Sequence, residues 1–251
     1  LTGDRSGRMS PTDEINTIFS GEAAEVPAIH ARRPRTYNEF FELISFPLQI
    51  CLFLLFAKSF TVESLVSATS SLTKNRYGWQ VKQVGTLGCI NGLLVIPISI
   101  LVGWVSNIYQ DRVILSVLVW FAIAGVFLLI DMSDLMSTDT DMYNEGHPLA
   151  VGPTRYVSGY FLTFASIQAL EGVVGSALSK VIPTALASGT WNSGLLATLI
   201  GTAGRTCGDF FISLVGFINI RQLMNLLFIP SFFVLIGCFL IIRRYYDVLA
   251  V

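Results

Sequence analysis

Ionisable side chains inside long apolar runs are the first feature of this sequence that could carry chemistry. Lys58 and Glu171 each lie within such a run, and Arg205 and Asp209 lie four residues apart in another. Because four residues are close to one helical turn, Arg205 and Asp209 are predicted to share a helix face. A charge at the centre of a bilayer costs roughly 2.5–3.5 kcal/mol on insertion scales, so these residues are predicted to have a role.

The two cations suit an oxyanion. The planar guanidinium of Arg205 donates paired hydrogen bonds, and Lys58 adds a point charge. We therefore predict that both bind an anion, while the carboxylates tune them or carry protons. An alternative is an ion pair between Arg205 and Asp209 that only holds helices together. The full set of predicted substrate-binding residues is Lys58, Arg205, Asp209, Glu171, Glu63, Gln168 and Asn192.

The composition is that of a membrane protein. Of the 251 residues, 53% are hydrophobic and only 13% are charged, whereas a soluble domain carries about 25% charge. A net charge of −1 argues against a nucleic-acid partner. The four cysteines fall inside apolar runs at spacings that match no metal site, and no enzyme motif is present. The sequence therefore predicts neither an enzyme nor a cofactor.

Six apolar segments are each long enough to cross a bilayer, which takes roughly 20 residues at 1.5 Å per residue. We predict an all-α membrane protein with six transmembrane helices at residues Phe46–Ser67, Gly85–Val105, Val113–Ile130, Tyr156–Leu178, Trp191–Phe217 and Leu223–Ile242. The transmembrane domain is residues 37–251. Residues 1–36, rich in Asp, Glu, Ser, Gly and Pro, are predicted to be a disordered cytosolic linker.

The six segments differ in what they carry at depth. The third and sixth have uncharged centres and can face lipid, whereas the other four carry charges, glycines or amides that need protein or water neighbours. This pattern fits one half of a major facilitator fold, with two inverted three-helix repeats. Such carriers hold substrate between two six-helix halves, so we expect a second half, in the same polypeptide or another subunit. Two GxxxG motifs, at Gly88–Gly92 and Gly204–Gly208, predict close helix contacts.

Basic residues indicate the orientation of the chain. One side collects Arg32, Arg33, Arg35, Arg112, Lys180, Arg243 and Arg244. The other has Lys74, Arg76, Lys82, Arg155 and Arg221, together with the acidic loop Asp131–Arg155. The positive-inside rule predicts that the first side, with both ends of the chain, is cytosolic. The Asp111–Arg112 pair on that side is a candidate conformational loop, although an Asp at a helix N-terminus is also favourable by itself.

Three segments together resemble the C-terminal half of the plant SPX–major facilitator proteins, the vacuolar phosphate transporters. Gly189–Phe217 reads GTWNSGLLATLIGTAGRTCGDFFISLVGF, Leu170–Val181 reads LEGVVGSALSKV, and Val102–Leu115 reads VGWVSNIYQDRVIL. Lys58 and Glu63 fall where that family has Lys and Glu. Two of its carboxylates are missing here: one from the Ser67–Ser70 segment, and one at the position of Leu199.

The resemblance implies a secondary transporter that moves inorganic phosphate or a related anion across a vacuolar or lysosome-like membrane by alternating access. The expected partners are then a small anion, the lipid bilayer and the second half. Two alternatives remain open: a transporter of another small solute, and a membrane subunit with a structural or regulatory role and no substrate path.

The orientation can be tested by cysteine labelling. In a variant with the four native cysteines replaced by alanine, Thr140→Cys should react with a membrane-impermeant maleimide only from the lumenal side, because the acidic loop is predicted to lie there. Labelling of intact organelles from the cytosol would reverse the assigned orientation.

Overall fold

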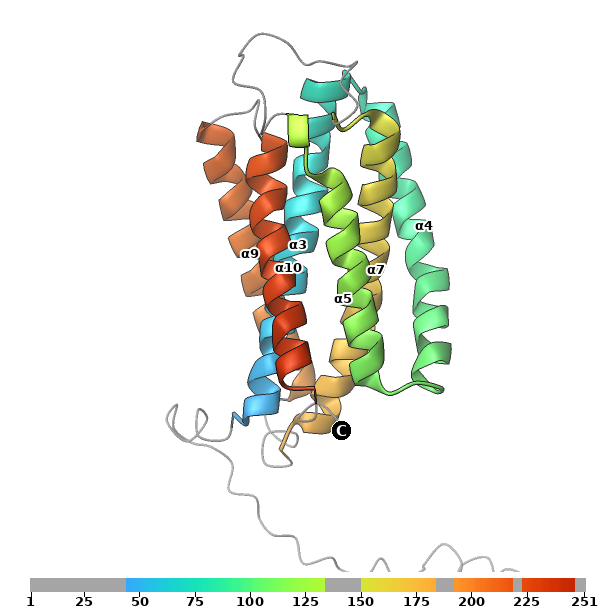
Figure 1. The fold of residues 1–251 in the computed structure, drawn as a ribbon, viewed down its shortest axis with the longest axis vertical. Coiled ribbons are helices and arrows are strands. Elements are labelled where there is room, and N and C mark those ends of the chain that lie inside the picture. Colours follow the sequence, from blue (N-terminus) through green and yellow to red (C-terminus); the bar gives the residue numbers. More distant parts are fainter. Residues whose placement is uncertain (1–43, 134–149, 184–191, 219–222, 247–251) are drawn as a thin grey trace, which may run out of the picture. The chain divides into compact units, whose positions relative to one another are not determined.

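The computed structural model describes residues 44–133, 150–183, 192–218 and 223–246, all within one compact unit. The predicted linker 1–36, most of the acidic loop, and Arg221 lie outside the described residues. Six long helices make up the described part (Figure 1): α3 (Phe46–Tyr77), α4 (Val81–Ser106), α5 (Asp111–Leu129), α7 (Pro153–Val181), α9 (Ser193–Ile218) and α10 (Leu223–Arg244).

Each predicted segment coincides with a helix, and α3 is the longest. It continues for ten residues past the predicted end at Ser67. Its polar extension is compatible with a helix because the hydroxyls of Thr69 and Thr73 donate to carbonyls one turn earlier, at 2.6 and 2.7 Å. It ends at Gly78, whose φ of 64° is a left-handed conformation that glycine adopts without strain.

Five of the six helices are long and apolar enough to cross a membrane, and α9 is the exception. Its 26 residues span about 39 Å at 1.5 Å per residue, which is sufficient length. Arg205 and Asp209 lie near the middle of α9, so any long stretch of this helix includes both charges. Five of the six predicted spans are therefore confirmed on length and composition, and α9 differs because its two charges lie near its middle.

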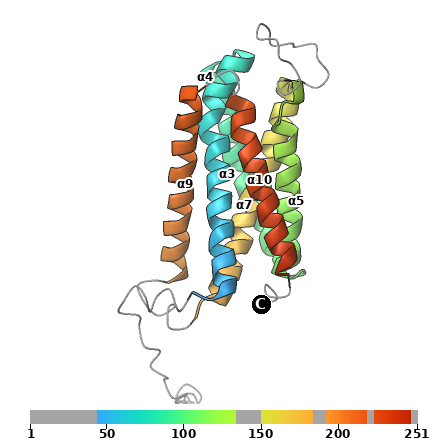
Figure 2. The same cartoon turned by 60° about the vertical axis from the view of Figure 1, so that its left-hand side comes forward.

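The helices alternate in direction, so that α3 begins and α10 ends at the same end of the bundle (Figure 1). Two of them, α3 and α7, are central: α3 packs against α4, α7, α9 and α10, and α7 packs against α3, α4, α5 and α9. Figure 2 shows α9 along one side of α3, with α5 on the opposite side of the bundle. The helix from Asp111 to Leu129 is therefore not at the centre.

The packing pattern has an internal symmetry. Helix α4 packs on α7 while α9 packs on α3, and α5 packs on α7 while α10 packs on α3. If α3 is exchanged with α7, α4 with α9, and α5 with α10, every pair of packed helices becomes another pair that is also packed. Since α3 and α7 run in opposite directions (Figure 1), the triplets α3–α4–α5 and α7–α9–α10 are related by inversion, as expected for inverted repeats.

Helices α5 and α10 pack on each other and each leaves an apolar face uncovered. The exposed side chains include Trp120 and Phe121 on α5, and Phe233 and Leu240 on α10. Large apolar side chains without charged neighbours suit contact with lipid tails. This agrees with the prediction that the third and sixth segments are peripheral.

Of the two GxxxG motifs, only the second mediates a contact within the described residues. A Cβ atom on Gly204 would lie 2.6 Å from the Phe56 carbonyl oxygen, and one on Gly208 would lie 2.9 Å from the Glu63 Cβ atom. Helix α9 therefore approaches α3 as closely as backbone allows. Gly88 and Gly92 have open space around them, so the prediction of close packing there is not met by any described helix.

Replacing Gly204 with alanine should destabilise the protein by about 1–3 kcal/mol, because the added methyl group meets backbone that cannot move away. The matched control is Gly216→Ala on the same helix, where nothing lies within 4 Å. The thermal unfolding midpoints of the purified variants in detergent measure the difference. Equal midpoints for the two variants would show that close α3–α9 contact is not required.

Candidate functional site

A central cavity of about 320 Å³ lies between α3, α7 and α9, and its volume is in the usual range for small-molecule sites. The residues that line it are Leu55, Lys58, Ser59, Glu171, Gly175, Ala197, Thr198, Gly201, Thr202 and Arg205. Three of the sequence-predicted site residues, Lys58, Glu171 and Arg205, are thus brought together from three helices.

The three ionisable groups lie at similar depth. Lys58 and Arg205 are each 12 residues from the start of their helices, or about 18 Å at 1.5 Å per residue. Glu171 is 10 residues from the end of α7, or about 15 Å from the same end of the bundle, because α7 runs in the opposite direction. The cavity therefore lies near the middle of the bundle.

Lys58 is paired with Glu171. The distance from Lys58 Nζ to Glu171 Oε2 is 2.6 Å, and the two side chains are 4% and 47% exposed. A buried ammonium without a partner would be strongly destabilising. The Glu171 carboxylate supplies the negative charge and the hydrogen-bond acceptor that the surrounding apolar side chains lack. The pair joins the two central helices, α3 and α7, at the level of the cavity.

Arg205 lines the cavity, is exposed, and forms no ion pair with any described residue, Asp209 included. Asp209 is also exposed and does not line the cavity, while its backbone carbonyl accepts a hydrogen bond from Ser213 Oγ at 2.9 Å. The predicted contact between Arg205 and Asp209 is therefore not formed. The i, i+4 spacing permits such a contact but does not require it.

The charges of the cavity sum to one positive unit when Lys58, Glu171 and Arg205 are all ionised. Lysine and glutamate cancel, and the guanidinium of Arg205 remains with its five N–H donors. The hydroxyl of Ser59 also lines the cavity. It is buried and forms no hydrogen bond with a described residue, so no other side chain competes with a ligand for it.

Three other predicted site residues lie outside the cavity lining. Glu63 accepts a hydrogen bond from Ser67 Oγ at 2.5 Å, and Gln168 lies one turn before Glu171, partly buried. Asn192 caps α9 by accepting the Leu195 N–H at 2.9 Å. It is 13 residues from Arg205, about 20 Å along the helix, and does not line the central cavity, so its role in substrate binding stays a prediction.

The cavity also contains polar residues that sequence reasoning missed. Thr198 and Thr202 on α9 line it together with Arg205. They precede Arg205 by seven and three residues, which places all three on one helix face. The sequence contains this signal, because residues three and seven positions before Arg205 lie on the same helix face and both are threonines.

The predicted conformational loop is tied to neighbouring helix ends. Asp111 is in the first turn of α5 and pairs with Lys180 Nζ of α7 at 2.7 Å. Arg112 lies over the ring of Tyr246, with its Cζ atom 4.5 Å from the ring centroid. Asp111 therefore has the favourable position at a helix N-terminus and also contacts a second helix, while the conformational role of this loop stays a prediction.

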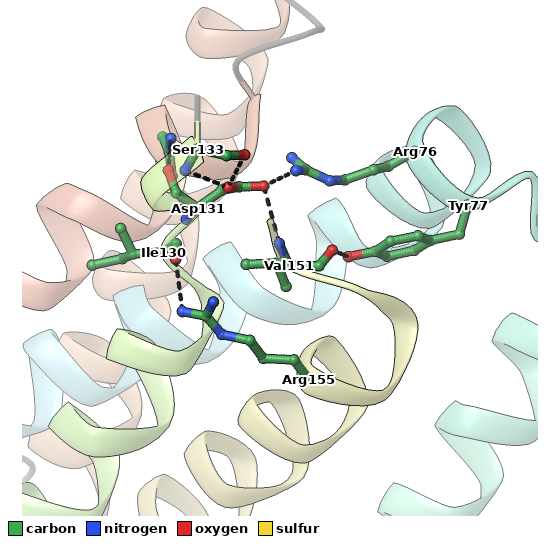
Figure 3. Close-up of polar contacts among 8 residues, drawn as sticks. Arg76, Tyr77, Ile130, Asp131, Ser133, Val151 and Arg155 are labelled. Atoms are coloured by element: carbon green, nitrogen blue, oxygen red, sulfur yellow. Dashed lines mark hydrogen bonds and ion pairs between the residues drawn. The ribbon is translucent and has the colours of Figure 1, made fainter. Parts of the chain in front are cut away.

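A second polar cluster lies at the opposite end of the bundle and is centred on Asp131, whose side chain is fully buried (Figure 3). Arg76 of α3 forms an ion pair with this carboxylate, and the backbone N–H groups of Ser133 and Val151 donate to it at 2.9 and 3.2 Å. The sequence indicated an acidic loop from Asp131 onward. Its first residue is instead buried, because it satisfies a cation and the N–H groups of the turn.

Further hydrogen bonds connect this cluster to four helix ends. Asn225 of α10 accepts from the Asp131 N–H and donates to the Asp131 carbonyl, both at 2.8 Å. Tyr77 donates to the Val151 carbonyl at 2.7 Å, and Arg155 donates to the Ile130 carbonyl at 3.2 Å (Figure 3). The cluster therefore joins the ends of α3, α5, α7 and α10, and satisfies backbone groups that helix ends leave unpaired.

These features define the class of protein. The described part is all-helical, five helices can cross a membrane, and its buried ion pairs lie at the cavity and at the helix ends. It is a multi-pass integral membrane protein.

The relatives are plant proteins. An SPX domain-containing membrane protein of Arabidopsis thaliana is 30% identical over 230 residues, covering 91% of this chain and 30% of that protein. Another from Arabidopsis thaliana is 31% identical over 192 residues, covering 76% and 25%. One from Oryza sativa subsp. japonica is 30% identical over 203 residues, covering 80% and 27%.

The chain is thus homologous to the SPX domain-containing membrane proteins of plants, and it spans between a quarter and a third of the length of these relatives. No family model matches the sequence, and no solved structure matches it.

The buried pair of Arg76 and Asp131 can be tested by a double-mutant cycle. Asp131→Asn alone should destabilise the protein by about 3–5 kcal/mol, because it leaves the Arg76 cation buried without its counter-charge. Adding Arg76→Met should restore part of this loss. Asp209→Asn, an exposed carboxylate on α9, is the control and should change little. Additive effects of the two substitutions in thermal unfolding would argue against coupling between them.

Proposed function

We propose that this chain is the C-terminal half of a secondary transporter of the major facilitator superfamily that moves inorganic phosphate or a related anion. The observation that carries the proposal is the central cavity, in which Lys58 is neutralised by Glu171 and Arg205 keeps its charge. A single uncompensated cation at mid-depth is stable only if water or an anion approaches it. The resemblance to vacuolar phosphate transporters supports phosphate as that anion.

The chemistry of the lining suits a tetrahedral oxyanion. The guanidinium of Arg205 can donate two parallel hydrogen bonds to neighbouring oxygens, and the hydroxyls of Thr198 and Thr202 lie on the same helix face.

The proposal includes a second six-helix half, in the same polypeptide or in another subunit. The central cavity is bounded by three described helices, α3, α7 and α9, and a carrier of this kind closes its site between two halves. The relatives are three to four times longer than the matched region, which leaves room for such a half. By the same resemblance we propose a vacuolar or related endomembrane location.

Arg205→Lys tests the anion-binding role in the intact protein. The substitution keeps the charge but loses the paired donors, so uptake of labelled phosphate into proteoliposomes should fall about tenfold or more per folded molecule. Arg244→Lys, at the exposed end of α10, is the matched control and should retain wild-type uptake. The amount of folded protein is measured by size-exclusion chromatography.

The results separate the competing functions. Competition by phosphate and sulfate, but not by a sugar, supports an anion carrier, and the reverse order indicates another small solute. Wild-type phosphate uptake in Arg205→Lys and Arg205→Ala would remove Arg205 as a ligand. Absence of any flux from the wild-type protein would favour a structural or regulatory subunit.

A further inference from the structure

A second cavity, of about 720 Å³, lies at the start of α4 and shares no lining residue with the central cavity. Its walls come from the turn between α3 and α4, the first turns of α4 and one face of α7. The lining residues are Gly78, Trp79, Gln80, Lys82, Gln83, Thr86, Leu87, Ile90, Val157 and Phe161. Polar residues lie near the helix start and apolar residues lie deeper.

The polar mouth presents hydrogen-bond donors. Gln80 and Gln83 form half of a capping box: the Gln80 N–H donates to Gln83 Oε1 at 2.7 Å, while the Gln83 N–H donates to the Gln80 backbone carbonyl at 3.0 Å. The Gln83 amide oxygen is thereby engaged, and the NH₂ groups of both side chains can donate to a ligand.

Positive charge accompanies these donors. Lys82 is exposed at the mouth and pairs with no carboxylate in the described ranges. It lies in the first turn of α4, where the backbone N–H groups add partial positive charge. An anionic group is therefore the ligand that the mouth favours.

The deeper part of the cavity is apolar. Ile90 is eight residues beyond Lys82, about 12 Å further into the bundle, and Phe161 and Val157 of α7 face it across the cavity. At the mouth, Trp79 packs against Tyr77 and Tyr156 with ring centroids 5.8 and 6.3 Å apart. Tryptophan and tyrosine are typical of the membrane–water interface, so the cavity extends from the interface into the hydrocarbon layer.

The mouth is held by its backbone. Gly78 closes α3 with φ of 64°, its N–H donates to the Lys74 carbonyl at 3.1 Å, and the Trp79 N–H donates to the Thr73 carbonyl at 3.3 Å. The hydrogen bonds between Gln80 and Gln83 then start α4 two residues after Gly78. Because both helix ends are hydrogen-bonded, the mouth is already ordered before a ligand binds. Binding therefore costs little conformational entropy there.

We propose that this cavity binds a membrane phospholipid with a net negative headgroup. The phosphate lies at Lys82 with the two glutamine amides, and one acyl chain follows Leu87, Ile90 and Phe161 into the bilayer. A free phosphate ion would satisfy the mouth but leave the apolar part empty, whereas a phospholipid matches both. The proposal requires only that the chain lies in a membrane, and is independent of the anion carried by the central cavity.

Native mass spectrometry of the intact protein in detergent tests the proposal. Dioleoylphosphatidylglycerol should bind more tightly than dioleoylphosphatidylcholine, which has the same chains and no net charge. Lys82→Gln should weaken phosphatidylglycerol binding about fivefold and weaken phosphatidylcholine binding less, because the choline group already offsets the charge of its phosphate. Lys74→Gln is the matched control, since Lys74 is exposed in the last turn of α3 but does not line the cavity.

Two further measurements separate a lipid from other occupants. Val157→Trp should fill the apolar part and abolish retention of both lipids, while thermal unfolding confirms that each variant is folded. Glycerol phosphate, which has the headgroup chemistry without chains, should not displace the lipid at equal concentration. The proposal is overturned if glycerol phosphate competes as well as the lipid, if the two lipids bind equally, or if Lys82→Gln and Lys74→Gln behave alike.

Discussion

The ion pair between Lys58 and Glu171 is the interaction on which the arrangement of the central helices depends. A charge inside an apolar bundle must be solvated, paired or removed, because apolar side chains cannot stabilise it. Lys58 is almost fully buried, so its helix must present it to a carboxylate, and α7 supplies one at 2.6 Å. This requirement sets the two central helices, which run in opposite directions, at one relative height.

The same constraint operates at both ends of the bundle. Asp131 is buried with Arg76 at one end, and Asp111 pairs with Lys180 at the other. Each pair joins helices from different repeats or their connections, and backbone groups at the helix ends complete the hydrogen bonding. Three levels of paired charge therefore hold α3, α5 and α7 together, while the faces of α5 and α10 that carry no charge are left for lipid.

Close packing of α9 against α3 determines the composition of the central cavity. Because Gly204 and Gly208 carry no Cβ atom, the α9 backbone approaches Phe56 and Glu63 directly. Arg205, next to the first of these glycines, is thereby carried to the cavity that Lys58 and Glu171 line. Its charge is the one that the pairing of Lys58 leaves uncompensated. The polar cavity at the start of α4 has a different origin, since it follows from how the turn after α3 is capped.

The sequence by itself determined the helices and the depth of their charges. Apolar runs long enough to cross a bilayer predicted all six helices, and counting residues placed Lys58, Glu171 and Arg205 near the middle. These inferences succeed because helical rise and periodicity are local properties that each segment carries in its own residues. The glycine spacing was a weaker guide, since it predicted close contact correctly at Gly204–Gly208 but not, among the described helices, at Gly88–Gly92.

Only the tertiary structure decided which charges meet. Lys58 pairs with Glu171, more than 100 residues away, while Arg205 does not contact Asp209 one turn along its own helix. Asp131 is buried although the loop that it begins is acidic, and Asn192 caps a helix rather than lining the cavity. Periodicity gives the face on which a side chain lies, but the neighbour opposite that face is set by how whole helices pack, and no local pattern records it.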